Sequence, residues 1–205
     1  GAAICSWLDL RADSSGLAHR HLSRWVALGA LAVAFLASVG FWKTSLGLAP
    51  PDIEHGSFLL DRFALFFYPV GLAAAGALLL TGAEAEAELE PHVGVYHALL
   101  LVSSAGVLFT ASAGDMASLA VGLAMTSLPL SLALGLRKTD SGSMRLAVRS
   151  LVISGVLLAT FVGGEAILAG LAQSTELRSL AQRPLPIDPL VALAALLLLV
   201  GAVGQ

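Results

Sequence analysis

Long apolar segments alternate with short polar ones along most of this 205-residue chain. Segments of 18 or more mostly apolar residues can cross the hydrocarbon core of a bilayer. Because lipid offers no water to the backbone, such segments are expected to be helices, which satisfy their own backbone groups. The pattern predicts an all-α, polytopic transmembrane helical bundle without a sheet. About six spans are predicted: Trp25–Trp42, Leu59–Leu80, Val95–Ser112, Met116–Leu136, Ala147–Leu171 and Pro189–Gly204.

The segments between these spans have the composition of loops. "LGLAPPDIEHG" contains two prolines, and "GAEAEAELEPH" carries four glutamates. No internal repeat is found, so residues 1–205 are predicted to form one membrane domain. The chain starts with Gly1 rather than Met and stops on an apolar segment without a polar tail. We therefore interpret it as a fragment of a longer subunit.

Composition narrows the classes of protein further. Hydrophobic residues make up 57% of the chain and charged residues 12%, about half the charged fraction of a soluble domain. The net charge of -3 argues against a nucleic-acid partner. The single Cys5 excludes an internal disulfide and a cysteine-cluster metal site. No nucleotide-binding or zinc-hydrolase motif occurs, so we expect no catalytic, cofactor-binding or metal-binding residues in this chain.

Basic residues predict the orientation, because cytoplasmic loops carry an excess of Lys and Arg. One side holds six of them: Arg11, Arg20, Arg24, Arg137, Lys138 and Arg145. The other side holds four: Lys43, Arg62, Arg178 and Arg183. The loop from Arg137 to Arg145 is therefore predicted to be cytoplasmic.

Two ionisable residues interrupt the fifth span. Arg149 and Glu165 are 16 residues apart, about 24 Å along a helix, so they cannot pair. Arg149 lies near the cytoplasmic end, where its side chain either snorkels to the interface or faces the bundle. Glu165 has apolar residues on both sides, and a carboxylate there should face protein or a water-lined cavity because lipid exposure is costly. The alternative is a glutamate at the interface, with Gly163 and Gly164 admitting a neighbouring helix.

Other polar residues in or near the spans have a structural and a functional interpretation. His97 suits a hydrogen-bonded interfacial residue or a proton relay. Asp115, in the short "SAGDM" segment, is expected to cap the fourth helix, and Pro129 can kink that helix. Three small hydroxyl residues either line a polar path or mediate helix packing: Thr126, Ser127 and Ser131.

Three stretches, read in order, resemble one family. "LLDRFALFF" (residues 59–67), "FTASAGDMASLAVGLAMTSLPLSLALGLRKTD" (109–140) and "AVRSLVISGVLLATFVGGEAILAGLAQSTEL" (147–177) are similar to segments of the antiporter-like subunit N of bacterial NADH:quinone oxidoreductase, respiratory complex I. The resemblance implies the N-terminal half of that subunit, with the six spans as its second to seventh helices. It also implies cytoplasmic loops where the basic residues predict them.

The resemblance implies a row of ionisable residues through the family's helices, the proton-transfer axis. This chain has different residues at those positions. The family's glutamate in its fifth helix is matched by Ala124, and the lysine of its sixth helix by Arg149. The lysine of its seventh helix is matched by Gln205. Arginine does not release a proton as a buried lysine can, and neither alanine nor glutamine titrates. The proton-path candidates are therefore Arg149, Glu165, Gln205 and, as a lost carboxylate position, Ala124.

By this resemblance the chain is expected to be a membrane-arm subunit of a proton-translocating NADH:quinone oxidoreductase, in the bacterial inner (cytoplasmic) membrane. Its partners would be lipid and the other membrane-arm subunits. NADH, FMN, the iron–sulfur clusters and quinone are expected to bind to partner subunits rather than to this chain. The alternatives are a degenerate, non-pumping antiporter-like subunit, a cation/proton antiporter or membrane hydrogenase subunit of the same family, and an unrelated transporter or scaffold.

Overall fold

The computed structural model of the chain describes residues 2–5, 16–45, 54–55, 58–82, 89, 92–136, 141–177, 180 and 188–204. These residues form a bundle of long helices, which confirms the all-α prediction. The named helices are α2 (Gly16–Ser45), α3 (Arg62–Thr81), α4 (Val93–Ala111), α5 (Met116–Ala133), the 3₁₀ turn η2 (Leu134–Leu136), α6 (Ser141–Ala172) and α8 (Pro189–Val203).

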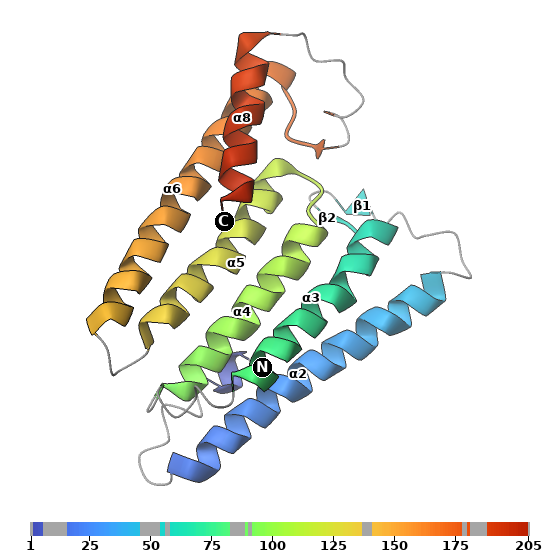
Figure 1. Cartoon of the computed structure of the whole chain (residues 1–205). Helices are drawn as coiled ribbons and strands as arrows, with labels where there is room; N and C mark the ends of the chain where they lie inside the picture. The colour runs from blue at the N-terminus through green and yellow to red at the C-terminus, as the bar shows by residue number, and fades with distance from the viewer. Residues whose placement is uncertain are drawn as a thin grey trace.

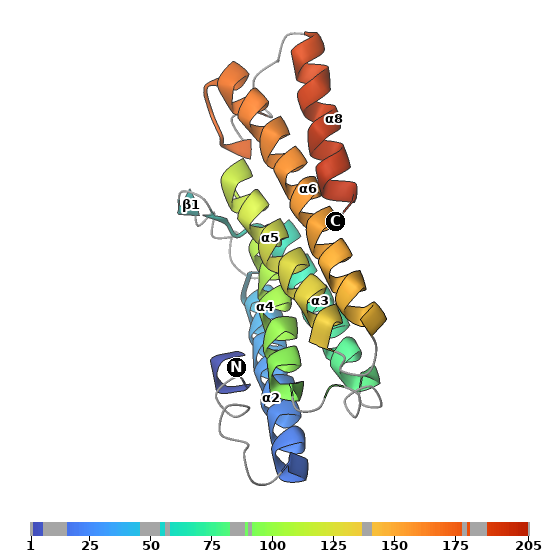
Figure 2. The same cartoon turned by 90° about the vertical axis from the view of Figure 1, so that its left-hand side faces the viewer.

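Helices α2 to α6 stand side by side in a row, each running opposite to the one before it (Figure 1). Helix α8 packs against α6, as the view turned by 90° also shows (Figure 2). One end of the bundle carries a small hairpin of two strands, β1 (Glu54–His55) and β2 (Phe58–Leu59). We call this the hairpin end, and the end where α5 gives way to α6 the opposite end.

Five of the predicted spans are long, apolar helices in the structure: Leu22–Trp42, Arg62–Thr81, Val93–Ala111, Met116–Leu136 and Gly142–Ala172. Helices α2 and α6 begin earlier than predicted, at Gly16 and Ser141, because hydropathy marks only the part of a helix suited to lipid. The sixth, α8, has 15 residues, which is about 22 Å and less than the hydrocarbon thickness. Many large apolar side chains point outward, as lipid contact requires, including Trp25 and Leu36, each 69% exposed.

Aspartates start three of the helices. The side chain of Asp61 accepts a hydrogen bond from the backbone N–H of Ala64 at 2.8 Å and caps α3. Asp188 caps α8, whose first residue is a proline, a position where the missing N–H costs nothing. At the other end of α6, Gln173 has a φ of 54°. This left-handed conformation ends the helix and turns the chain back.

Glycines bring neighbouring helices into backbone contact. A Cβ on Gly106 of α4 would lie 2.6 Å from the carbonyl carbon of Met125 in α5. A Cβ on Gly201 of α8 would lie 2.7 Å from the backbone nitrogen of Phe161 in α6. Small residues allow such approach in membrane bundles, where van der Waals packing stabilises helix pairs.

The hairpin is the one departure from the prediction of no sheet within the described residues. It is a two-residue ladder, in which Glu54 pairs with Leu59 and His55 with Phe58. The backbone N–H of Leu59 also donates to the carbonyl oxygen of Ser112 at 2.9 Å. Hydropathy does not predict these bonds, because they join backbone groups and do not depend on burial of apolar side chains.

Candidate functional site

Glu165 is a buried carboxylate on α6. Only 8% of the residue is exposed, and it shares a face of the helix with Phe161 and Leu168, which are also buried. Leu168 packs in one cluster with Met116 of α5 and Ala194 of α8. Glu165 therefore lies where three helices meet, near the hairpin end.

Gly164 makes this meeting of helices possible. A Cβ on Gly164 would lie 2.8 Å from the carbonyl oxygen of Ala194. The neighbouring Gly163 has no atom within 4 Å of the same test position. Of the two glycines expected to admit a neighbouring helix, only Gly164 does so within the described residues.

Asp115 brings a second carboxylate to the site. It caps α5 as predicted: its Oδ1 accepts from the backbone N–H of Ser118 at 2.6 Å, within a complete capping box. The next residue, Met116, belongs to the same buried cluster as Leu168, which places the two carboxylates at the same end of the same interface.

A backbone pairing adds a third carboxylate. Residues 174–177, which we call the strap, return along the α4–α5 link. The backbone N–H of Met116 donates to the carbonyl oxygen of Thr175, and that of Leu177 to Gly114, each at 3.1 Å. Asp115 and Glu176 are thus directly opposite in an antiparallel bridge, of the kind without hydrogen bonds between the pair, in which side chains lie closest. Glu176 is exposed.

The three carboxylates differ in burial: Glu176 is exposed, Asp115 is half-buried and Glu165 is buried. Half-buried Asp188, which caps α8, lies at the same end. Arg62 is the first residue of α3, and α4 and α5 stand between α3 and α6 (Figure 1). The charged residues that the structure describes in α5, α8, their N-caps and the strap are all acidic.

The family's axis positions are separated in the structure. Ala124 is half-buried on α5. It shares a face with Met116 and Ser131 by helical periodicity, and both of these reach α6. Arg149 is exposed, so among the described residues its side chain is not buried in the bundle, the second of the two arrangements considered for it. It also lies far from Glu165 along α6. Gln205 lies outside the described residues.

Serines, rather than Arg149, fill the α5–α6 contact at this level of the bundle. The hydroxyl of Ser131 lies 3.0 Å from that of Ser150 and 3.4 Å from that of Ser154. It also donates to the carbonyl oxygen of Ser127 at 3.0 Å. Successive residues of an α-helix point about 100° apart around its axis. Ser150 therefore faces α5 while the preceding residue, Arg149, faces outward.

The remaining polar candidates form local or packing bonds. Thr126 and Ser127 donate to carbonyl oxygens one turn earlier in α5. His97 is fully buried, and its Nδ1 lies 3.2 Å from the hydroxyl of Ser23 in α2. His97 thus ties α4 to α2 as a hydrogen-bonded core residue rather than one at the membrane interface.

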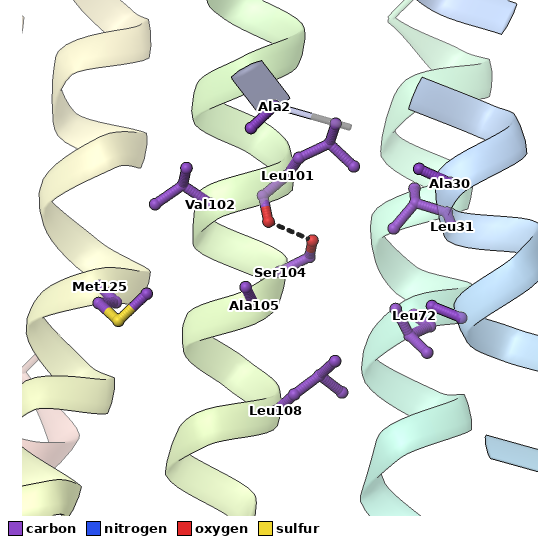
Figure 3. Close-up of a pocket in the computed structure, with 11 residues that line it drawn as sticks. Ala2, Ala30, Leu31, Leu72, Leu101, Val102, Ser104, Ala105, Leu108 and Met125 are labelled. Carbon is purple, nitrogen blue, oxygen red and sulfur yellow. Dashed lines mark hydrogen bonds between the residues drawn. The ribbon is translucent and has the colours of Figure 1, made fainter. Parts of the chain in front are cut away.

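An apolar groove of about 310 Å³ lies between α2, α3, α4 and α5 (Figure 3). Leu31, Leu72, Leu108 and Met125 line it, with no charged side chain among its described lining residues. Its one hydroxyl, that of Ser104, donates to the carbonyl oxygen of Leu101 at 2.8 Å. The described lining residues thus offer no charged side chain and one hydroxyl that is already bonded within α4, so the carboxylates near Glu165 are the better candidate site.

Comparison with known proteins gives consistent relatives. No family model matches the chain. It is 33% identical over 186 residues to NADH-quinone oxidoreductase subunit N 1 of Koribacter versatilis, covering 83% of this chain and 36% of that protein. The subunit N of Geobacillus kaustophilus is 33% identical, with 86% and 35% coverage. That of Bacillus anthracis is 35% identical, with 87% and 36% coverage.

A solved structure matches the fold. The membrane-bound sulfane sulfur reductase, an archaeal respiratory membrane complex, contains a chain that aligns with a TM-score of 0.73 over 98% of this chain and 43% of its own length. At 18% identity this likeness concerns the fold alone. The present chain spans about a third of the length of the curated relatives it matches.

Proposed function

The matched part of this chain belongs to the subunit N family of NADH-quinone oxidoreductases, and from that premise we propose that it is a membrane-arm subunit of a proton-translocating NADH:quinone oxidoreductase. The chain is a multi-pass membrane protein, and we place it in the bacterial inner (cytoplasmic) membrane. Its identity of 33–35% to three subunits N over 83–87% of its length carries the proposal.

The proposed role is ion movement or its support, not redox chemistry. A chain with one cysteine cannot by itself hold an iron–sulfur cluster, which takes four ligands. We therefore assign NADH, FMN, the iron–sulfur clusters and quinone to partner subunits. Other membrane-arm subunits and lipid would cover the large apolar side chains that now face outward.

A non-pumping, scaffold role is the second candidate, and two residues favour it. By the resemblance in sequence, Ala124 is matched to a glutamate of the family and Arg149, which is exposed, to a lysine. If this region lacks the family's proton carriers, it would still brace neighbouring subunits through its packed helices. The two candidates differ in whether any carboxylate of this chain exchanges protons.

Purification from native membranes tests the proposal. The full-length protein, tagged and solubilised in mild detergent, should bring with it the other subunits of the complex and NADH-driven quinone reduction. Deletion of its gene should abolish or weaken that activity in membranes. Purification of the protein alone, with quinone reduction unchanged in the deletion strain, would contradict the proposal.

A further inference from the structure

Glu165 makes no hydrogen bond with any residue that the structure describes, although only 8% of it is exposed. Every fully buried side-chain nitrogen or oxygen of the described residues does have a partner. The Glu165 oxygens therefore lie at the edge of accessible space rather than enclosed in the packing. The described residues give Glu165 no hydrogen-bond donor. An ionisable group within a membrane helix is costly to keep, and this cost points to a use for its ionisation.

We propose that Glu165 is a proton-exchange site that opens to the aqueous surface at the hairpin end, with Asp115 and Glu176 forming a negatively charged approach to it. The inference deepens the proposed function, since it gives this chain a proton carrier in place of the altered axis residues. The basic residues of the loops predict the hairpin end to be the outer side, so the site would exchange protons with that side.

The arrangement suits proton exchange. Closely spaced carboxylates raise the local concentration of cations, hydronium included. A proton passes from hydronium to a Glu165 oxygen, an O–H bond forms and water leaves; release reverses these steps, and no electrons are transferred. Asp188 adds negative charge from α8, and the loop residues Arg178 and Arg183 lie outside the described residues.

Asp115 is a positioning residue in this proposal. The backbone N–H of Ser118 fixes its carboxylate at the first turn of α5, and the strap fixes its backbone. Its charge is therefore held beside Glu165 while it caps the helix. Asn is as good a helix cap as Asp, so Asp115→Asn removes the charge and keeps the cap.

Divalent metal binding fits the site less well. Calcium takes six or more oxygen ligands, whereas the described residues include no group of three or more His, Cys, Asp or Glu arranged to hold a metal ion. Protection of Glu165 by added cations at constant pH is the outcome that would favour a bound cation instead.

Carbodiimide labelling of the full-length protein in native membranes tests the site directly. Dicyclohexylcarbodiimide enters apolar surroundings and modifies carboxyl groups in their protonated form, and peptide mass spectrometry locates the product. We expect Glu165 to be labelled, and the labelling to fall about tenfold for each pH unit above its midpoint, as for one titrating group. Absent or pH-independent labelling would overturn the proposal, as would protection by sodium or calcium at fixed pH.

Two variants refine this test. Asp115→Asn should move the midpoint of Glu165 labelling, whereas an unchanged midpoint would overturn the role given to Asp115. Glu176→Gln removes the outer charge of the approach and should move the midpoint in the same direction as Asp115→Asn but by less, because Glu176 is exposed. Asp61→Asn, which keeps the cap of α3, is the control and should leave the midpoint unchanged. Glu165→Gln should remove the label from its peptide.

Proton pumping by the assembled complex is the second readout. Glu165→Gln should lower the number of protons moved per electron pair, with NADH oxidation by an artificial acceptor unchanged, and Glu165→Asp should restore pumping in part. Full pumping in Glu165→Gln would overturn the proposal. Labelling does not require the complex to be NADH-quinone oxidoreductase, so a failed co-purification with pH-dependent labelling would contradict the proposed function alone.

Discussion

Gly164 of α6 lies directly against Ala194 of α8: a Cβ on Gly164 would be 2.8 Å from the carbonyl oxygen of Ala194. No side chain fits between the two backbones at this point. The contact fixes how α8 covers α6 and therefore how Glu165, the next residue, is enclosed.

Gly164→Val should separate α6 from α8. Because the valine would meet backbone atoms that cannot rotate away, we expect a loss of about 1–3 kcal/mol in stability, measured as a lower melting temperature of the full-length protein in detergent. Gly163→Val is the matched control, since nothing lies within 4 Å of that position, and it should change the melting temperature little. Equal effects of the two substitutions would contradict this packing.

Gln173→Gly should stabilise the protein. Gln173 ends α6 with a φ of 54° and is exposed, so it keeps a left-handed conformation that costs a residue with a Cβ about 1–2 kcal/mol. Glycine loses more entropy on folding, which leaves an expected net gain of about 0.5–1 kcal/mol. Chemical denaturation in mixed micelles measures it. Gln173→Ala keeps the Cβ, so stabilisation by both variants would indicate another cause.

His97 and Ser23 should be energetically coupled. His97 is fully buried and its Nδ1 lies 3.2 Å from the Ser23 hydroxyl. A double-mutant cycle with Ser23→Ala and His97→Leu should give a coupling free energy of about 0.5–1.5 kcal/mol, the usual net value of a hydrogen bond. Since His97 ties α2 to α4, either variant that still assembles should pump protons normally. Reduced pumping in His97→Leu, without loss of assembly, would favour the relay interpretation.

The sequence predicted the helices well because the bilayer imposes a length and a composition on each of them. It also predicted the cap at Asp115, since capping is a local property of four residues. It did not predict that Asp115 lies at the same end of the α5–α6 interface as Glu165, 50 residues later in the chain. That proximity depends on the strap, whose backbone hydrogen bonds leave no pattern of apolar and polar residues.

Arg149 illustrates the other limit. A match to a family places a residue at a height along a helix, but the direction of its side chain depends on the rotation of that helix. Ser150 and Ser154 reach α5, whereas Arg149 is exposed. The small residues of α5 and α6 permit this close contact, which only the three-dimensional packing reveals.

Cysteine labelling should establish that the hairpin end faces away from the cytoplasm. Cys5, the one cysteine of this sequence, is fully buried, so this part of the protein adds little background to a single introduced cysteine, and the unsubstituted protein measures the rest. Thr139→Cys, in the basic loop outside the described residues, should react with a membrane-impermeant maleimide only in inside-out vesicles, because the excess of Lys and Arg predicts a cytoplasmic loop. Gln173→Cys, exposed at the hairpin end, should react only in intact cells or right-side-out vesicles. The reverse pattern would place Glu165, Asp115 and Glu176 on the cytoplasmic side. The proposed site would then take up protons from the cytoplasm instead of exchanging them with the outer side.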